Sequence, residues 1–306
     1  MLFLLLMSGL IACNIYKVAE KHIDKRMTAA EMHLNLEVID GDTIEYWDNG
    51  RDKPVMVLVH GFGASTKYQW FRQVEWLSEH YRVIMPNLNY FGRSRPAADN
   101  YTVDGQVKLV HKLLDHLKVE KYVLCGISYG GLTVFEMALQ RPEACTAMIS
   151  FDAPVKYMYS KDIEVVCKRF EVETVQELFA PSNPKGLKKL LYLATLKKSI
   201  IPASWLTEFY EQLYAVDIED KRMLITQLLA DVEMFNAREY HLEMPILLIW
   251  GDNDPLIPAD RGELLRQHLG ENARLEYVHK GAHAPNLAKT KAFNKVFQAF
   301  LEEVMP

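Results

Sequence analysis

Cysteine is scarce in this chain of 306 residues, and there is no surplus of positive charge. The four cysteines are too few for a disulfide scaffold, and no two of them have the spacing of a zinc-binding pair. Lys and Arg number 35 against 40 Asp and Glu, which gives a formal net charge of -5. Nucleic-acid-binding proteins usually carry a basic footprint that this chain lacks. We therefore expect no nucleic-acid partner and no metal site.

Long hydrophobic runs are also rare. The apolar stretch at residues 1–12 is shorter than the roughly 20 residues that span a bilayer, but it suits the apolar region of a secretory signal. Residues 10–13, which read LIAC, resemble a bacterial lipoprotein signal. That resemblance implies cleavage before Cys13 and lipidation of its thiol. Residues 14–32 would then form a charged spacer between the membrane and a domain in the periplasm or exterior.

One feature departs from the lipoprotein pattern, because no Lys or Arg precedes the apolar run. Two alternatives therefore remain open. Residues 1–13 could be a short uncleaved anchor, whose following positive charges would place the domain on the cytoplasmic side. The start codon could also be misassigned.

From residue 33 onward, strand and helix patterns alternate. Strand-like runs at 33–38 and 43–47 flank Asp40-Gly41-Asp42, which predicts a hairpin. The alternation predicts an α/β fold with a mostly parallel sheet, helices on both faces and the hairpin at one antiparallel edge. Further strands are expected at 55–59, 81–85, 122–127, 147–151, 246–250 and 274–278, and a helical stretch is expected near 68–79.

Residues 155–240 have a helical pattern and no comparable buried strand. We interpret this stretch as a helical insertion that lies over the carboxyl edge of the sheet. The predicted core domain then consists of residues 33–154 and 241–306.

The sequence Gly126-Ile127-Ser128-Tyr129-Gly130 lies between a predicted strand and a predicted helix. A nucleophilic serine is held on such a sharp turn, where small neighbours let the backbone pack closely. The following helix directs its positive N-terminal end at developing negative charge. We therefore predict that Ser128 is a nucleophile.

A serine needs a base, and the base needs an orienting acid. Carboxylates at Asp252 and Asp254 follow the strand at 246–250, and His283 follows the strand at 274–278. These positions bring an acid and a histidine to the same sheet edge as Ser128. The order Ser, Asp, His along the chain is the one expected of this architecture.

From about residue 55 to the C-terminus the sequence resembles the α/β-hydrolase superfamily. The blocks that carry the resemblance are 60–63, 86–94, 126–130, 251–258 and 281–285. The resemblance implies Asp254 as the acid, His283 as the base and a helical cap at 155–240. It also implies an oxyanion hole made by the backbone N–H groups of Phe62 and Tyr129.

Two residues depart from the family pattern, because Asn87 and Tyr90 stand where Asp and Gly are common. They leave the shape of the loop at 86–94 open. The serine at 128 also separates this chain from epoxide hydrolases and haloalkane dehalogenases of the superfamily, which use an aspartate nucleophile.

Several residues have simpler interpretations. Asp252 and Asp152 remain alternative acids, and Asp152 is otherwise expected near the cap hinge, solvated or hydrogen-bonded. His60 is expected to form structural hydrogen bonds beneath the oxyanion loop. His279 is expected at the surface, and Cys125 as a buried residue of a strand.

The combined expectation is a serine hydrolase, without cofactor, that cleaves carboxylic esters through an acyl-enzyme on Ser128. The apolar N-terminus and the apolar residues at 155–240 favour a lipophilic ester, as in a carboxylesterase or acylglycerol lipase. Hydrolysis of a lactone, a thioester or a carbon–carbon bond is an alternative, and so is a receptor that binds such ligands without turnover.

Overall fold

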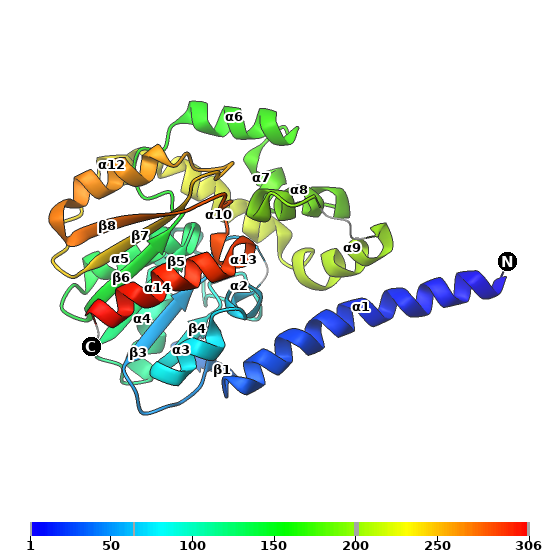
Figure 1. Ribbon diagram of the computed structural model, residues 1–306, viewed down its shortest axis with the longest axis horizontal. Helices are drawn as coiled ribbons and strands as arrows, with labels where there is room; N and C mark the ends of the chain where they lie inside the picture. The colour runs from blue at the N-terminus through cyan, green and yellow to red at the C-terminus, as the bar shows by residue number, and fades with distance from the viewer. Residues whose placement is uncertain (1, 64, 199–201, 305–306) are drawn as a thin grey trace.

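The computed structural model describes residues 2–63, 65–198 and 202–304, with side chains from residue 16 onward. Its centre is an eight-stranded sheet in the order β1-β2-β4-β3-β5-β6-β7-β8 (Figure 1). The strands β1 and β2 pair antiparallel, as do β2 and β4, and the other neighbours are parallel. The strands are β1 (His33–Ile39), β2 (Asp42–Asp48), β3 (Val55–Val59), β4 (Arg82–Pro86), β5 (Tyr122–Ile127), β6 (Cys145–Phe151), β7 (Ile246–Gly251) and β8 (Ala273–Val278).

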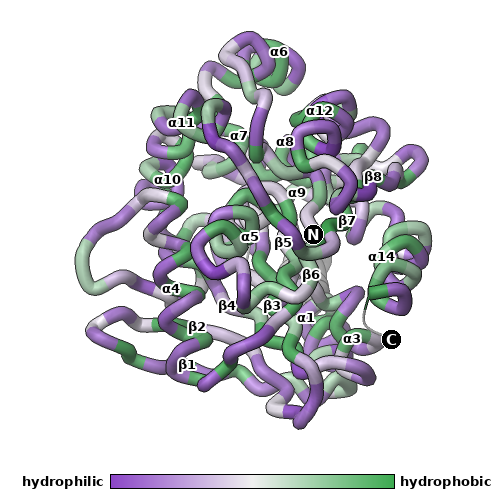
Figure 2. Tube along the Cα trace, turned by 90° about the vertical axis from the view of Figure 1, so that its left-hand side faces the viewer, coloured by the Kyte–Doolittle hydropathy of each residue, from purple (hydrophilic) through white to green (hydrophobic). Residues whose placement is uncertain are grey.

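The predicted α/β architecture is confirmed, with helices on both faces of the sheet. One face is covered by α4 (Val103–His116), α5 (Tyr129–Gln140) and α12 (Asp260–Leu269), the other by α3 (Val74–His80) and α14 (Thr290–Val304). Alternation along β3 sends Val57 and Val59 into the first layer and Met56 and Leu58 into the second. Figure 2 shows hydrophobic segments in the central strands and mixed polarity along the helices around them.

The leading hairpin also forms as predicted. Asp40 and Gly41 have φ angles of 47° and 85°, which is the left-handed conformation that a two-residue hairpin turn requires. The single helix expected near residues 68–79 is instead two helices, α2 (Thr66–Trp70) and α3. They separate at Gln73, whose buried side chain donates a hydrogen bond to the Asn286 carbonyl at 3.2 Å.

Helices fill the chain between β6 and β7, as expected for residues 155–240. The His283 loop contacts this segment, because the Ala284 N–H donates to the Ala194 carbonyl at 2.9 Å. The elements of the segment are α6 (Ser160–Phe170), α7 (Val175–Phe179), α8 (Pro184–Thr195), α9 (Ala203–Phe209), a π-helical turn (Tyr210–Tyr214), α10 (Ile218–Ala230) and α11 (Val232–Ala237).

Residues 14–32, expected as a charged spacer, are helical as far as Ala29. Residues 2–29 form one helix, α1 (Leu2–Ala29), whose N-terminal part leads away from the sheet in Figure 1. Its last turns pack on the domain, because Ile23, Met27 and Ala30 are buried in the layer that contains α3. Cys13 lies within α1, and its side chain is outside the described part. Among the helices described, none is both long and apolar enough to cross a membrane.

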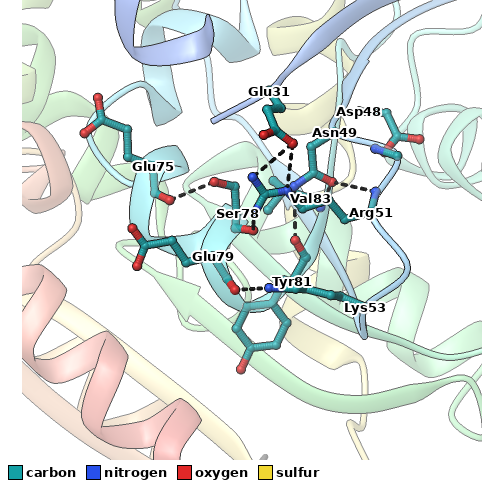
Figure 3. A network of polar contacts seen from close by, with 11 residues as sticks. Glu31, Asp48, Asn49, Arg51, Lys53, Glu75, Ser78, Glu79, Tyr81 and Val83 are labelled. Atoms are coloured by element: carbon teal, nitrogen blue, oxygen red, sulfur yellow. Dashed lines mark hydrogen bonds and ion pairs between the residues drawn. The ribbon is translucent and has the colours of Figure 1, made fainter. Parts of the chain in front are cut away.

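Polar contacts hold the end of α1 to the domain (Figure 3). The Arg51 guanidinium binds the Glu31 carboxylate at 3.0 Å and also donates to the Ser78 carbonyl at the end of α3. Asn49 donates to the Tyr81 carbonyl and accepts from the Val83 N–H, both at 3.1 Å. Arg51 therefore ties the chain entering β1 to the end of α3, and Asn49, in the same β2–β3 connection, is tied to the start of β4.

Because the end of α1 packs on the domain, truncating a buried residue of this helix should destabilise the protein, which would not happen if the segment were a free spacer. Met27 is 2% exposed, so Met27→Ala should lower the free energy of unfolding by about 2–4 kcal/mol through lost burial and a residual cavity. Urea titration of the variant measures this loss. Lys25→Ala, at an exposed position of the same helix, is the matched control and should change stability little. Equal stability of the two variants would contradict the packing of α1.

Candidate active site

Ser128 occupies the sharp turn between β5 and α5. Its φ and ψ angles are 53° and -123°, a strained conformation for a residue with a side chain. The turn leaves no room for larger neighbours, because a Cβ added at Gly126 would lie 2.6 Å from the carbonyl carbon of Gly130. A Cβ at Gly130 would lie 2.8 Å from the carbonyl carbon of His60. Both glycines are therefore required by close backbone approach, as the sequence pattern predicts.

The structure brings the three predicted catalytic side chains together from the ends of three strands. Ser128 follows β5, Asp254 follows β7 and His283 follows β8. The distance from His283 Nε2 to Ser128 Oγ is 2.9 Å, and that from His283 Nδ1 to Asp254 Oδ2 is 2.8 Å. His283 is 5% and Ser128 8% exposed, so both residues are nearly buried.

The surroundings of Asp254 decide the tautomer of His283. Asp254 Oδ1 accepts hydrogen bonds from the Leu256 N–H at 2.7 Å and the Ile257 N–H at 3.2 Å. These donors stabilise the ionised carboxylate, whose other oxygen faces His283. The imidazole therefore donates from Nδ1 and presents the lone pair of Nε2 to the Ser128 hydroxyl. This arrangement suits removal of a proton from an alcohol.

The loop after β3 lies against the serine turn. A Cβ added at Gly61 would meet both the Ile127 carbonyl oxygen and Ser128 Cβ at 3.1 Å, which places the neighbouring Phe62 beside Ser128. Tyr129 is the first residue of α5. The predicted oxyanion donors, the N–H groups of Phe62 and Tyr129, thus belong to two segments that meet at Ser128.

His60 has the structural role predicted for it. Its Nε2 accepts a hydrogen bond from the Leu88 N–H at 3.0 Å, so the proton is on Nδ1, which donates to the Gly61 carbonyl at 2.8 Å. Burial lowers the pKa of His60 to about 4, which keeps the ring neutral. The ring thereby supports the loop that carries Phe62.

The departures at Asn87 and Tyr90 shape the adjacent loop. Asn87 is buried; its Oδ1 accepts from the Thr66 N–H at 2.7 Å, and its Nδ2 donates to Glu45 at 2.6 Å. Tyr90 adopts a φ of 69° and stacks on Tyr101 with ring centroids 4.8 Å apart. Asn87 and Tyr90 therefore fix the loop at residues 86–94 through their own contacts with Thr66, Glu45 and Tyr101.

The alternative acids lie in different places. Asp252 binds His279 at 2.9 Å, and the His279 side chain is 80% exposed, so this pair lies at the surface. Asp152 is completely buried beside Asp254, and its Oδ1 accepts from the Gly251 N–H at 2.9 Å. Asp152 is therefore hydrogen-bonded but not solvated. Cys125 is buried within β5, and burial raises the pKa of its thiol.

Two cavities meet at Ser128. The first is almost entirely apolar: helices α7, α10 and α11 supply much of its wall, and its polar lining residues are Ser128, Tyr129 and Asn236. The second lies on the His283 side. Its wall is also largely apolar, with several leucines from α8, but it includes the polar side chains of Ser65, Tyr68, Gln69, Thr195 and Tyr214. Within the described residues, no three His, Cys, Asp or Glu side chains gather as a metal site requires.

Sequence reasoning missed the cavity walls and the contact of Asp152 with Asp254. Helical periodicity identified α10 as a helix, but it did not show that Ile225 and Leu228 face the serine. The signal for Asp152 was its place at the end of β6, because β6 and β7 are neighbours in the sheet.

Known proteins share this architecture. The family model described as the alpha/beta hydrolase fold matches residues 54–289. A monoacylglycerol lipase of Bos taurus is 24% identical over 82% of this chain and 76% of its own length. A 3-oxoadipate enol-lactonase of Acinetobacter baylyi is 23% identical over 92% of this chain and 97% of its own.

Among solved structures, a bacterial membrane phospholipase A superposes with a TM-score of 0.78. It is 23% identical in sequence, and the match covers 99% of this chain and 97% of that one. The family model covers well over half of the chain, and the sheet order and helices described above agree with it. The protein therefore belongs to the alpha/beta hydrolase family and is a hydrolase.

Proposed function

We propose that the protein is a serine hydrolase that cleaves carboxylic esters with a lipophilic acyl group. The observation that carries the proposal is the 2.9 Å contact between Ser128 Oγ and His283 Nε2 at the mouth of an apolar cavity. The contact supplies a base for the nucleophile. The cavity offers an apolar acyl chain a site from which water is excluded.

The proposed reaction has two acyl-transfer steps. Ser128 attacks the ester carbonyl while His283 Nε2 takes its proton, and Asp254 stabilises the imidazolium. The N–H groups of Phe62 and Tyr129 bind the oxyanion, a contribution of about 3 kcal/mol per donor. His283 then protonates the leaving alcohol, and a water molecule that His283 activates releases the acid from Ser128.

The two cavities support a division of the substrate. The acyl chain would occupy the first cavity, and the alcohol would lie in the second, where Gln69, Thr195 and Tyr214 offer polar groups that the first cavity lacks. Helices α7, α8, α10 and α11 contribute to these walls, so residues 155–240 would act as a cap that selects the substrate. An ester between a lipophilic acid and a small polar alcohol, such as an acylglycerol, fits this division.

The enol-lactonase relative, which matches 92% of this chain, favours lactone hydrolysis as a second candidate. The same nucleophile, base and oxyanion donors would open a cyclic ester. A panel of linear esters from two to sixteen carbons, with lactones and thioesters beside them, distinguishes the candidates by kcat/KM.

Ser128 is the proposed nucleophile, so its removal should abolish turnover. Ser128→Ala should lower the kcat for a chromogenic butyrate ester on the order of 10⁴-fold or more, because the attacking oxygen is lost. A fluorophosphonate probe should label the wild-type protein and not this variant. Ser182→Ala, at an exposed loop position, is the matched control. A wild-type protein that binds esters without Ser128-dependent turnover would instead be a receptor.

The depth of the apolar cavity should set the preferred length of the acyl chain. Leu228 lies on α10 and lines the apolar cavity, so Leu228→Trp should shorten the space for the chain. The ratio of kcat/KM for a dodecanoate over a butyrate ester should fall about tenfold, since poor fit in an apolar pocket costs about 1–3 kcal/mol. Met223→Trp, on the exposed face of the same helix, should leave the ratio unchanged. An unchanged ratio in Leu228→Trp would place the acyl chain elsewhere.

We also propose that the N-terminal segment attaches the enzyme to a membrane of the bacterial envelope through lipidated Cys13. The apolar run at residues 1–12 supports attachment, and the short uncleaved anchor remains the alternative. Intact mass of the protein isolated from its native membrane should show loss of residues 1–12 and a diacylglyceryl adduct on Cys13. A mass that retains Met1 and carries no lipid would contradict lipidation.

A further inference from the structure

A second buried carboxylate lies beside the one in the triad. Asp152 follows β6 and is completely buried, and its Oδ1 accepts from the Gly251 N–H at 2.9 Å. The Gly251 carbonyl in turn accepts from the Asp254 N–H at 3.0 Å, so the two aspartates are neighbours at the turn after β7. The Asp254 side chain is also fully buried. Two ionised carboxylates in contact at a buried site repel each other strongly, so one of them must hold a proton.

The hydrogen-bond donors show which carboxylate is ionised. Asp254 accepts from two backbone N–H groups, those of Leu256 and Ile257, and from His283 Nδ1. Asp152 accepts from one, the Gly251 N–H, through Oδ1. In the described part of the chain, no donor reaches the buried Oδ2 of Asp152. The negative charge is better stabilised on Asp254, and a proton on Asp152 Oδ2 would give that atom a partner.

We propose that Asp152 is a positioning residue of the active site, a neutral carboxylic acid that donates a hydrogen bond from Oδ2 to the Asp254 carboxylate. The inference rests on the proposed function, because it assigns Asp254 the task of orienting His283. Burial and the neighbouring Asp254 raise the pKa of Asp152 well above its ordinary value, which is consistent with the neutral form. The donated hydrogen bond holds the carboxylate in place and leaves a single negative charge behind the imidazole.

The backbone around Asp152 holds the acid in this position. Its φ angle is 46°, and its N–H donates to the Ile249 carbonyl of β7 at 3.2 Å. The side chain is thus fixed between β6 and β7, and its Oδ1 is held by Gly251 at the end of β7. In the described structure, the titratable groups that face it are Asp254 from the loop after β7 and, beyond it, His283 from the loop after β8.

The pH dependence of kcat/KM for a soluble chromogenic ester distinguishes a neutral from an ionised Asp152. Asp152→Ala removes the donor, so Asp254 would hold a proton on His283 more firmly. The acidic limb of the kcat/KM profile, where activity rises with pH, should therefore move to higher pH. The kcat should also fall about tenfold or more through loss of positioning, with little change in KM. Asp152→Asn still donates through Nδ2 and accepts through Oδ1. It should rescue most of the lost kcat and keep the wild-type acidic limb.

Asp252→Asn is the matched control. It removes a carboxylate from the loop that carries Asp254, but this carboxylate contacts the surface residue His279 and not His283. This variant should leave the acidic limb of the pH profile unchanged. If Asp152 were ionised, Asp152→Asn would delete a negative charge and move the limb to lower pH, which would overturn the proposal. A wild-type kcat and pH profile in a folded Asp152→Ala variant would overturn it as well.

Infrared difference spectra provide a readout that does not depend on turnover. Subtracting the Asp152→Asn spectrum from the wild-type spectrum should leave the C=O stretch of a protonated carboxylic acid, and a carboxylate band there would overturn the proposal. This measurement stands even if Asp152→Ala does not fold. If the wild-type protein proved inactive toward every ester, the proposed function would fail while the infrared result would still report the protonation state of Asp152.

Discussion

The hydrogen bonds from Asp254 through His283 to Ser128 are the constraint around which this molecule is organised. A serine hydroxyl is a weak nucleophile unless a neutral imidazole reaches it, and here the two atoms lie 2.9 Å apart. The three side chains come from loops after β5, β7 and β8. Parallel strands end at the same edge of the sheet, so these loops converge although residues 128 and 283 are far apart in sequence. The strained backbone at Ser128 and the packed glycines around it belong to the turn that presents the hydroxyl to His283.

Burial gives these contacts their strength and limits which charges the site tolerates. The Asp254 side chain is fully buried and accepts hydrogen bonds from backbone N–H groups, while His60 remains neutral beneath the loop that carries Phe62. In a medium of low dielectric constant, a second ionised group near Asp254 would be costly. The neutral form proposed for Asp152 follows from the same balance. With Asp152 neutral, Asp254 would hold the single negative charge of this buried pair.

Several parts of the site could be predicted from sequence because they depend on local chemistry. The Gly-x-Ser-x-Gly turn requires small residues at 126 and 130 wherever it occurs, and strand β5 runs over the predicted residues. The hairpin at Asp40-Gly41 likewise follows from the φ angles that its residues tolerate. The helix expected at 68–79 was less accurate, because the helix breaks at residues 71–73. There Gln73 bonds to Asn286, more than 200 residues away, a contact that no local pattern reveals.

By itself, the sequence determined the α/β architecture, the strand ends that carry Ser128, Asp254 and His283, and the helical character of residues 155–240. Period-two and period-3.6 hydrophobic patterns and short-range turn chemistry are properties of neighbouring residues, so they can be read along the chain. Only the tertiary structure decided that residues 16–29 pack on the domain as part of α1, which faces of α7 and α10 line the apolar cavity, and that Asp152 meets Asp254. Those outcomes depend on contacts between distant segments, whose geometry is set by packing against the sheet and is absent from any local pattern.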